Sequence, residues 1–221
     1  MKDGFLGCVA GGVLAMAAGL APATASAQSI SVGVGTQGFN AEVGLDFGEQ
    51  FGVRASGNYF SMSKDVDGDD VNYDGDLRLQ SIGLLGDFYP FQNGFRFSGG
   101  VYLNRNKVDI TATPTGNVEI GGTTYAPAQV GNLSGDIKFN DISPYAGLGY
   151  TSSRGVPGLS FVADAGVMFQ GGGDVTLIST GSANTSPGFA ADLEQERLDI
   201  QDDVDNFKYY PVVRIGIAYR F

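Results

Sequence analysis

The sequence predicts an all-β fold: a closed, antiparallel, eight-stranded transmembrane β-barrel with one amphipathic helix in its last long loop. Three observations predict it. The chain begins like an exported protein, eight later segments alternate apolar residues with polar or small ones, and short and long connections follow each other between those segments. A period of two gives a strand two different faces, and strands cross a membrane only when their sheet closes into a barrel.

Residues 1–27 have the pattern of a cleaved export signal and are expected to lie outside the fold. Lys2 provides a positive start, an uncharged apolar run covers residues 4–20, and residues 25–27 (Ala-Ser-Ala) form a small-residue cleavage site. The alternative is a membrane anchor, but about seventeen apolar residues are marginal for a span. We therefore expect export through the Sec route and a mature barrel domain over residues 28–221.

The composition argues against several function classes. A formal net charge of −11 disfavours nucleic acid as a partner, and the single cysteine, Cys8, lies inside the predicted signal. The chain has no histidine, the residue on which many hydrolases built on membrane barrels rely as a base. The carboxylate pair Asp69 and Asp70 is the remaining acid–base candidate, and no substrate cleft is predicted beside it. We expect no catalysis and no cofactor.

Eight segments are predicted to be strands with one apolar face. They cover residues 30–35, 39–47, 51–59, 81–89, 95–104, 141–150, 159–170 and 209–221. Most are long enough, at about 9–11 residues, to cross tilted hydrocarbon; the first is short, and Leu85 breaks the alternation of the fourth. If residues 30–47 formed one long strand instead of a hairpin, seven strands would remain and this barrel would not close.

The connections predict how the barrel is oriented. Short turns are expected at residues 48–50, 92–94 and 154–158, and long loops at residues 61–76, 110–134 and 171–206. Because such barrels have short periplasmic turns and longer outside loops, both chain ends are predicted on the periplasmic side. The turn at residues 36–38 is then the one short connection on the outside.

The polar faces of the strands are assigned to the lumen, where they bring together four acids and four bases. Side chains fill the interior of an eight-stranded barrel, and buried charges need partners. We therefore expect a sealed lumen with an ion-pair network of Glu42, Asp46, Arg54, Asp87, Arg96, Asp164, Arg214 and Arg220. The alternative is that these charges line a narrow pore or transporter for small solutes.

Aromatic residues near the strand ends are expected to face lipid and to form the two interfacial girdles. The predicted members are Tyr59, Phe88, Phe95, Tyr150, Tyr209, Tyr219 and Phe221.

The first long loop is acidic, with six aspartates in residues 65–76. Carboxylate oxygens are the ligands of calcium loops, so Asp65, Asp67, Asp69 and Asp70 are candidate metal ligands. Gly68 comes too early for an EF-hand, and we expect a solvated acidic loop with no specific metal site. Such a loop would still be able to touch divalent cations that bridge lipid phosphates.

The other two long loops differ in pattern. Residues 110–134 are rich in Thr, Gly and Asn and are expected to be irregular, with a short hairpin around Gly121 and Gly122. Residues 187–207 place apolar residues three or four positions apart, which predicts an amphipathic helix with Ser186 as its N-cap. We expect this helix to cap the barrel mouth with its apolar stripe; the alternative is that the stripe binds a partner.

The last strand carries a resemblance to a known group. Its final Tyr219-Arg220-Phe221 resembles the closing strand of bacterial outer-membrane barrels. With the export signal and the pattern of short and long connections, nearly the whole mature chain resembles the small OmpA/OmpX/OmpW-like eight-stranded outer-membrane proteins of Gram-negative bacteria. The segment from Asp87 to Phe91 and the acidic helix before Tyr210 are similar to an uncharacterised proteobacterial branch of that group.

This resemblance implies a location and partners, but no activity. It implies a monomer in the outer membrane, in contact with membrane lipid and lipopolysaccharide. The sequence departs from full-length OmpA-like proteins in that no added peptidoglycan-binding domain is expected, and so no cell-wall tether is expected either. The resemblance also implies an assembly signal that the barrel-assembly machinery reads during biogenesis, formed by Val213, Ile215, Ile217, Tyr219 and Phe221. A structural or surface-interaction role is our first hypothesis; a soluble secreted β-sandwich is a further alternative to the barrel.

Overall fold

The barrel closes by pairing its first and last strands. A computed structural model of the protein describes residues 28–221, so the predicted export signal and Cys8 lie outside the described residues. Strand β1 (Gln28–Gly35) pairs antiparallel with β13 (Tyr209–Arg220), and Phe221 donates its backbone N–H to the carbonyl oxygen of Gln28. Within the described chain, the barrel wall therefore has no free edge.

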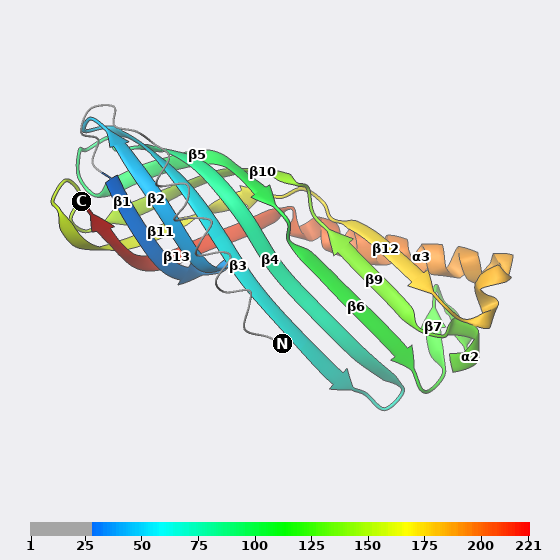
Figure 1. Cartoon of the computed structure of the whole chain (residues 1–221). Coiled ribbons are helices and arrows are strands. Elements are labelled where there is room, and N and C mark those ends of the chain that lie inside the picture. Colours follow the sequence, from blue (N-terminus) through cyan, green and yellow to red (C-terminus); the bar gives the residue numbers. More distant parts are fainter. Residues whose placement is uncertain (1–27) are drawn as a thin grey trace.

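Eight antiparallel strands make this wall, as predicted (Figure 1). In order around the barrel they are β1, β2 (Gly38–Phe47), β3 (Phe51–Asp67), β4 (Val71–Phe88), β5 (Phe95–Asn104), β10 (Ile142–Thr151), β11 (Gly158–Phe169) and β13. The alternative of one strand over residues 30–47 is wrong, because β1 and β2 pair as a hairpin. The β-sandwich is also wrong, because these eight strands close into one barrel and do not form two sheets packed face to face.

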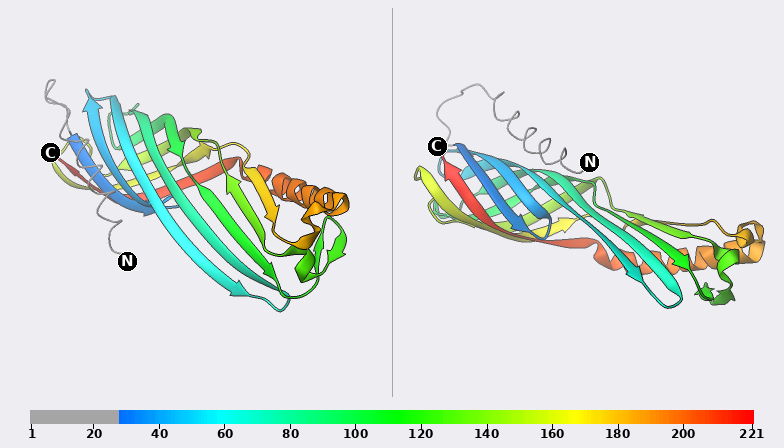
Figure 2. Two further views of the ribbon diagram at one scale, coloured as in Figure 1. Left: turned by 45° about the vertical axis from the view of Figure 1, so that its right-hand side comes forward. Right: turned by 60° about the horizontal axis from the view of Figure 1, so that its bottom comes forward.

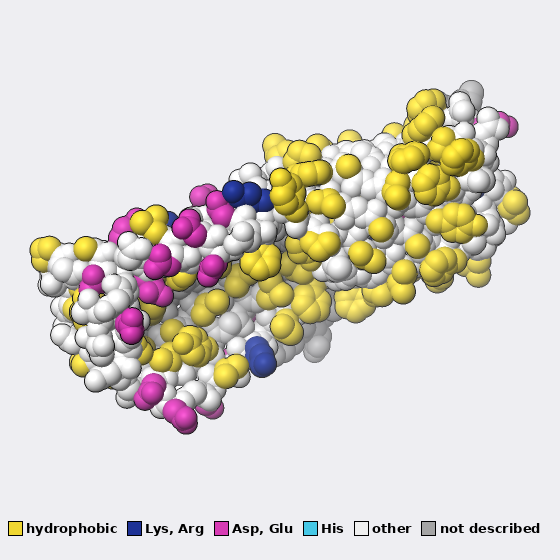
Figure 3. All heavy atoms as spheres, turned by 180° about the vertical axis from the view of Figure 1, so that it is seen from behind, with side chains coloured by type: hydrophobic (Ala, Val, Ile, Leu, Met, Phe, Trp, Pro, Cys, Tyr) yellow, Lys and Arg dark blue, Asp and Glu magenta, His cyan; other side chains and the backbone are white. Residues whose placement is uncertain are grey.

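The outward face of the wall is apolar and uncovered. Val213, Ile215 and Ile217 are 51 to 57 % exposed, and hydrophobic side chains cover the barrel end of the molecule in Figure 3. Aromatic residues pair near both ends of the wall: Phe169 with Tyr209 at one end, Tyr219 with Phe221 at the other. Apolar side chains thus lie on the outside of the wall, where a water-soluble protein would place polar ones. A barrel surrounded by hydrocarbon requires this arrangement.

Two strands continue beyond the barrel where a loop was predicted. Residues 61–76 are not an acidic loop but the outer halves of β3 and β4, paired up to a turn at residues 68–70. Three further strands extend that sheet beside β4, in the order β6 (Lys107–Pro114), β9 (Leu133–Lys138) and β12 (Asp174–Ser179). We call residues 60–80, 105–140 and 171–208 the extension.

The far end of the extension is closed by short elements. A hairpin of β7 (Val118–Ile120) and β8 (Thr123–Tyr125) turns at residues 121–122, as predicted. The helical turns α2 (Pro127–Val130) and η1 (Ser182–Thr185) lie beside it. The remaining loop region is therefore more regular than the sequence indicates.

The predicted helix is present but does not cap the barrel mouth. Helix α3 (Pro187–Val204), followed by η2 (Asp205–Phe207), runs along the extension (Figures 1 and 2). Ser186 is its N-cap residue, although its side chain makes no capping hydrogen bond. The helix lies here because its apolar residues find partners on the extension: Phe189 is buried in one cluster with Ile120 and Val130. Among residues 28–221, no helix is long and apolar enough to cross a membrane.

Helix α3 also protects the free edge of β12. The side-chain amide of Gln201 accepts a hydrogen bond from the Val175 N–H at 3.1 Å and donates one to the Gly173 carbonyl at 2.5 Å. Arg197 adds a donor at 3.4 Å to the Val175 carbonyl. An unpaired strand edge attracts other chains, so these side chains take the place of a missing neighbour strand.

Barrel closure sets a test at Gly216. Its partner across the seam is Gly33, and a Cβ at position 216 would lie 2.4 Å from the carbonyl oxygen of Val32. We expect Gly216→Val to push β1 away and to lower the temperature at which the compact, unboiled gel band is lost. Gly86→Ala is the control, because its Cβ would meet nothing nearer than 3.7 Å. Equal melting of the two variants would contradict the seam geometry.

Candidate functional site

The centre of the lumen holds a closed ring of six alternating charges. In order around the ring they are Glu42, Arg54, Asp87, Arg96, Asp164 and Arg214. Each comes from a different strand, respectively β2, β3, β4, β5, β11 and β13. The signs alternate around the wall, so each acid has a base from a neighbouring position on both sides.

The contacts in this ring are short. Arg54 lies 2.9 Å from Glu42 and 2.6 Å from Asp87. Arg214 lies 2.6 Å from Glu42 and 2.5 Å from Asp164. Arg96 completes the circle, at 2.5 Å from Asp164 and 3.8 Å from Asp87. A further contact of 3.5 Å joins Arg54 to Asp164 across the lumen.

Burial makes the ring depend on its full set of partners. None of the six side chains is more than 10 % exposed. Neutral groups satisfy several of the donors and acceptors that remain: Ser98 donates to Asp87 at 2.6 Å, Asn40 accepts from Arg214, and Thr151 accepts from Arg96 at 2.7 Å. The buried Nε of Arg96 has no hydrogen-bond partner within the described residues. A buried charge left without its partner costs several kcal/mol, so the ring favours a single register of the wall.

The two strands that give no charge to the ring leave room for it. On β10, a Cβ at Gly149 would lie 2.5 Å from the carboxylate of Asp164 and 2.6 Å from the guanidinium carbon of Arg96. On β1, the small Ser31 donates to Glu42 at 3.3 Å. Arg96 therefore reaches from β5 past β10 to its partner on β11.

The other two predicted charges lie in a second cluster near the chain ends. Arg220 forms an ion pair with Asp46. Arg154 joins them from the turn after β10, at 3.9 Å from Asp46, and its guanidinium stacks 3.5 Å from the centre of the Tyr89 ring. Sequence interpretation missed Arg154, because a turn residue belongs to no alternating face that would assign it to the lumen.

An apolar plug lies next to the ring, on strand faces that the sequence interpretation assigned as polar. Its buried members come from five strands: Leu85, Tyr102, Tyr145, Met168 and Val212, with Tyr210 packed against them. The Tyr102 and Tyr145 rings meet edge to face at 5.5 Å. The break that Leu85 makes in its strand is thus explained, since the side chain fills the lumen.

The lumen contains little free space. Cavities along it measure about 50 Å³ at the end near Arg220 and about 10 Å³ between the ring and the plug. A cavity needs a volume of roughly 10–15 Å³ to hold one water molecule. The smaller cavity therefore holds at most one water, and the ring and plug together separate the two ends.

The predicted assembly residues all lie on the outward face of β13 or just after it. Val213, Ile215, Ile217, Tyr219 and Phe221 are each 47 to 64 % exposed. Because they alternate along one strand, they form one continuous row on the outer surface of the barrel.

The candidate metal ligands are not assembled into a site. Asp65 and Asp67 lie at the end of β3, and Asp69 and Asp70 lie in the turn that follows. Across residues 28–221, no group of three or more acidic, cysteine or histidine side chains is placed to hold a metal ion.

The outer face of the extension carries a row of bases beside a row of acids. Arg78, Lys107 and Lys138 are direct neighbours on adjacent strands, close to the barrel wall. Lys107 lies 2.5 Å from Asp136, and Lys138 lies 2.8 Å from it. Burial alone would raise the pKa of Asp136, but hydrogen bonds from these lysines outweigh that effect and hold its pKa at about 2.

Comparisons with known proteins support the fold. No protein-family model matches the chain, and no curated protein matches it in sequence. Among solved structures, CarO2 of Acinetobacter baumannii is 21% identical with a TM-score of 0.60, over 90% of this chain and 100% of that one. CarO of the same organism is 21% identical with a TM-score of 0.56, over 87% and 97%. At this identity the likeness shows a shared fold, that of a closed β-barrel.

The ring predicts a large effect of removing one acid. Asp164→Asn leaves three buried arginines with two carboxylates, and we expect it to lower the free energy of unfolding by about 3–5 kcal/mol. Urea unfolding in detergent, followed by loss of the compact band, measures this. Asp174→Asn, at an exposed position on the extension, is the control and is expected to change stability by less than about 0.5 kcal/mol. Equal loss in both variants would rule out a stabilising ring.

Proposed function

We propose that this protein is a non-catalytic barrel of the Gram-negative outer membrane with a sealed lumen, which holds the extension at the cell surface as a platform for interactions. The proposal includes export through the Sec route, insertion by the barrel-assembly machinery, and a monomer of the OmpA/OmpX/OmpW-like kind. The observation that carries it is the filled lumen: the charged ring and the apolar plug leave no continuous path.

The direction of the barrel follows from its two ends. Both described chain ends and the short turns lie at one end, and the extension lies at the other (Figure 1). Short turns face the periplasm in barrels of this kind, so the extension would stand outside the cell. An apolar wall without an open channel then serves mainly to anchor and orient what it carries.

Basic residues at the base of the extension support contact with lipopolysaccharide. Five of its seven bases lie close to the barrel wall: Arg78, Arg105, Lys107, Lys138 and Lys208. Figure 3 shows bases where the apolar barrel meets the acidic extension. Within the described residues, Arg78 and Arg105 form no ion pair. Neighbouring like charges repel, and lipid phosphates at this level would relieve that repulsion.

The sealed lumen is tested by conductance. In planar bilayers, the purified protein is expected to give no steady, reproducible current, because the lumen cavity between the ring and the plug measures only about 10 Å³. Insertion is checked separately by recovering the compact, unboiled band from liposomes. A reproducible conductance would overturn this proposal and support the alternative, a narrow pore or transporter for small solutes.

The lipid contact is tested by charge removal. Adding lipopolysaccharide is expected to raise the melting temperature of the wild type, and this rise is expected to vanish in the Arg78→Gln, Arg105→Gln double variant. Lys64→Gln with Arg197→Gln removes the same charge elsewhere on the extension and is expected to keep the rise in melting temperature that lipopolysaccharide gives the wild type. Dephosphorylated lipid A is expected to have no effect. The same rise in both double variants would contradict phosphate binding at the base.

A further inference from the structure

The inner face of the extension is apolar although it lies beyond the barrel. In β3 and β4, the strand face that lines the lumen continues beyond the barrel as the inner face of the extension, because side chains alternate along a strand. Strand pairing continues this inner face from β4 through β6 and β9 to β12. The side chains on it are almost all aliphatic or aromatic: Phe60, Met62, Val66, Val71, Tyr73, Leu77, Leu79, Val108, Ile110, Ala112, Leu133, Ile137, Val175 and Leu177.

Helix α3 covers only part of this face. It packs on β12 and β7, at one side of the sheet. On the other side Met62, Val66, Tyr73 and Ile110 remain 41 to 49 % exposed, and the outer half of β3 has a strand partner only on its β4 side. Figure 3 shows the resulting hollow with hydrophobic side chains inside it.

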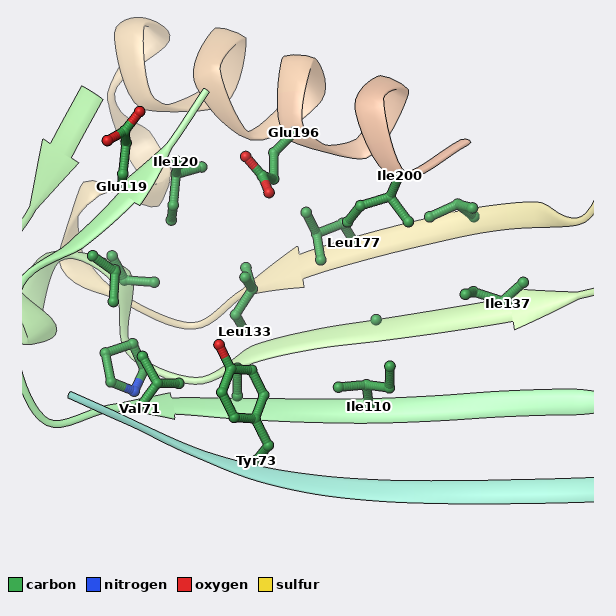
Figure 4. A pocket seen from close by; sticks show the side chains of 16 residues that line it. Val71, Tyr73, Ile110, Glu119, Ile120, Leu133, Ile137, Leu177, Glu196 and Ile200 are labelled. Atoms are coloured by element: carbon green, nitrogen blue, oxygen red, sulfur yellow. The ribbon is translucent and has the colours of Figure 1, made fainter. Parts of the chain in front are cut away.

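A cavity of about 250 Å³ lies in this hollow, between the sheet and α3. Leu177, Ile110 and Tyr73 line it from the sheet, and Ile200 lines it from the helix (Figure 4). Small-molecule sites in proteins typically measure about 300–1,000 Å³ and are lined mainly by apolar side chains with a few placed polar groups. The cavity thus has the lining of a ligand site and the size for one short alkyl chain.

The charged groups at the cavity are both acidic. Glu196 projects from α3, where it accepts a hydrogen bond from the Gly121 N–H at 3.2 Å, and Glu119 lies on β7 two residues from that glycine (Figure 4). The side chain of Glu119 makes no hydrogen bond or ion pair in the part of the chain described. The carboxylate of Glu196 beside the cavity, with that of Glu119 on the exposed face of the adjoining strand, favours a cation at the cavity mouth.

The charge of the whole extension acts in the same direction. It contains 17 acidic and 7 basic residues, and most of the bases lie at its base near the barrel. Of the residues that line the cavity, none is basic. A surface with one sign of charge raises the local concentration of ions of opposite sign, so cations would gather here and anions would be repelled.

We propose that this cavity binds a small amphiphile with a short alkyl chain and a cationic head group. The chain lies against Ile110 and Leu177, and the head group lies beside Glu119 and Glu196. This site is separate from the lumen, so it does not depend on whether the barrel conducts.

A tryptophan reporter tests the proposal, because the chain has no tryptophan of its own. Full-length protein with Tyr73→Trp is placed in phosphatidylcholine nanodiscs and titrated with octyltrimethylammonium. We expect a saturable blue shift of the emission. Octyl sulfate, which has the chain without the cation, and tetramethylammonium, which has the cation without the chain, are each expected to bind at least tenfold more weakly.

Two variants locate the site, both made in the reporter protein and checked by the compact band. Ala112→Phe fills the cavity and is expected to abolish the shift. Glu119→Gln with Glu196→Gln keeps the shape of the cavity and is expected to weaken octyltrimethylammonium at least fivefold, whereas Glu194→Gln on the exposed side of α3 is expected to change nothing. Absence of saturation, equal binding of octyl sulfate, or unchanged binding in the double glutamine variant would each overturn the proposal.

Discussion

The alternating ring of charge across the lumen is the constraint on which the rest of the barrel depends. Six strands each contribute one charged side chain, and the order of signs follows the order of the strands. Because the side-chain period of a strand is two, a slip of one residue would move its charge from the lumen into lipid. A slip of two residues would separate each acid from its bases. The ring thus selects one register for a wall whose apolar face is otherwise uniform.

The plug and the second cluster act together with the ring. Aromatic and aliphatic side chains fill the lumen on the side toward the extension, and Arg154 stacked on Tyr89 fills part of the side toward the chain ends. Polar groups in a low-dielectric interior are costly unless satisfied, and the hydroxyl and amide partners of the ring meet most of that need. The lumen of the barrel is therefore largely filled with side chains.

Sequence alone predicted most of the barrel and little of the extension. The wall was predictable because its two faces meet different surroundings, lipid outside and a polar lumen inside. Residues such as Val213 and Arg214 alternate between the two, and this alternation is visible in the sequence. In the extension the same alternation occurs, with Val108 and Ile110 against Lys107 and Asp109. It is shorter there and mixed with Thr, Pro and Gly, which are typical of loops.

The lumen charges were also only partly predictable from the sequence. The eight lumen charges were identifiable from the face they occupy, whereas their pairing was not, because pairing depends on strand order and on gaps such as Gly149. Arg154 reaches the lumen from a turn, and Met168 and Val212 bring apolar groups to a face assigned as polar. The position of α3 depended on partners such as Ile120 and Val130, which lie in a hairpin far away in the sequence.

Access of a water-soluble reagent to the lumen tests the sealed ring most directly. Ser98 is 5 % exposed and donates to Asp87 inside the barrel, and the predicted mature chain has no cysteine of its own. We expect Ser98→Cys, folded in liposomes, to resist a charged methanethiosulfonate reagent until the protein is boiled, while Ser61→Cys on the exposed extension reacts at once. Labelling of both cysteines at similar rates in the folded protein would contradict a filled lumen.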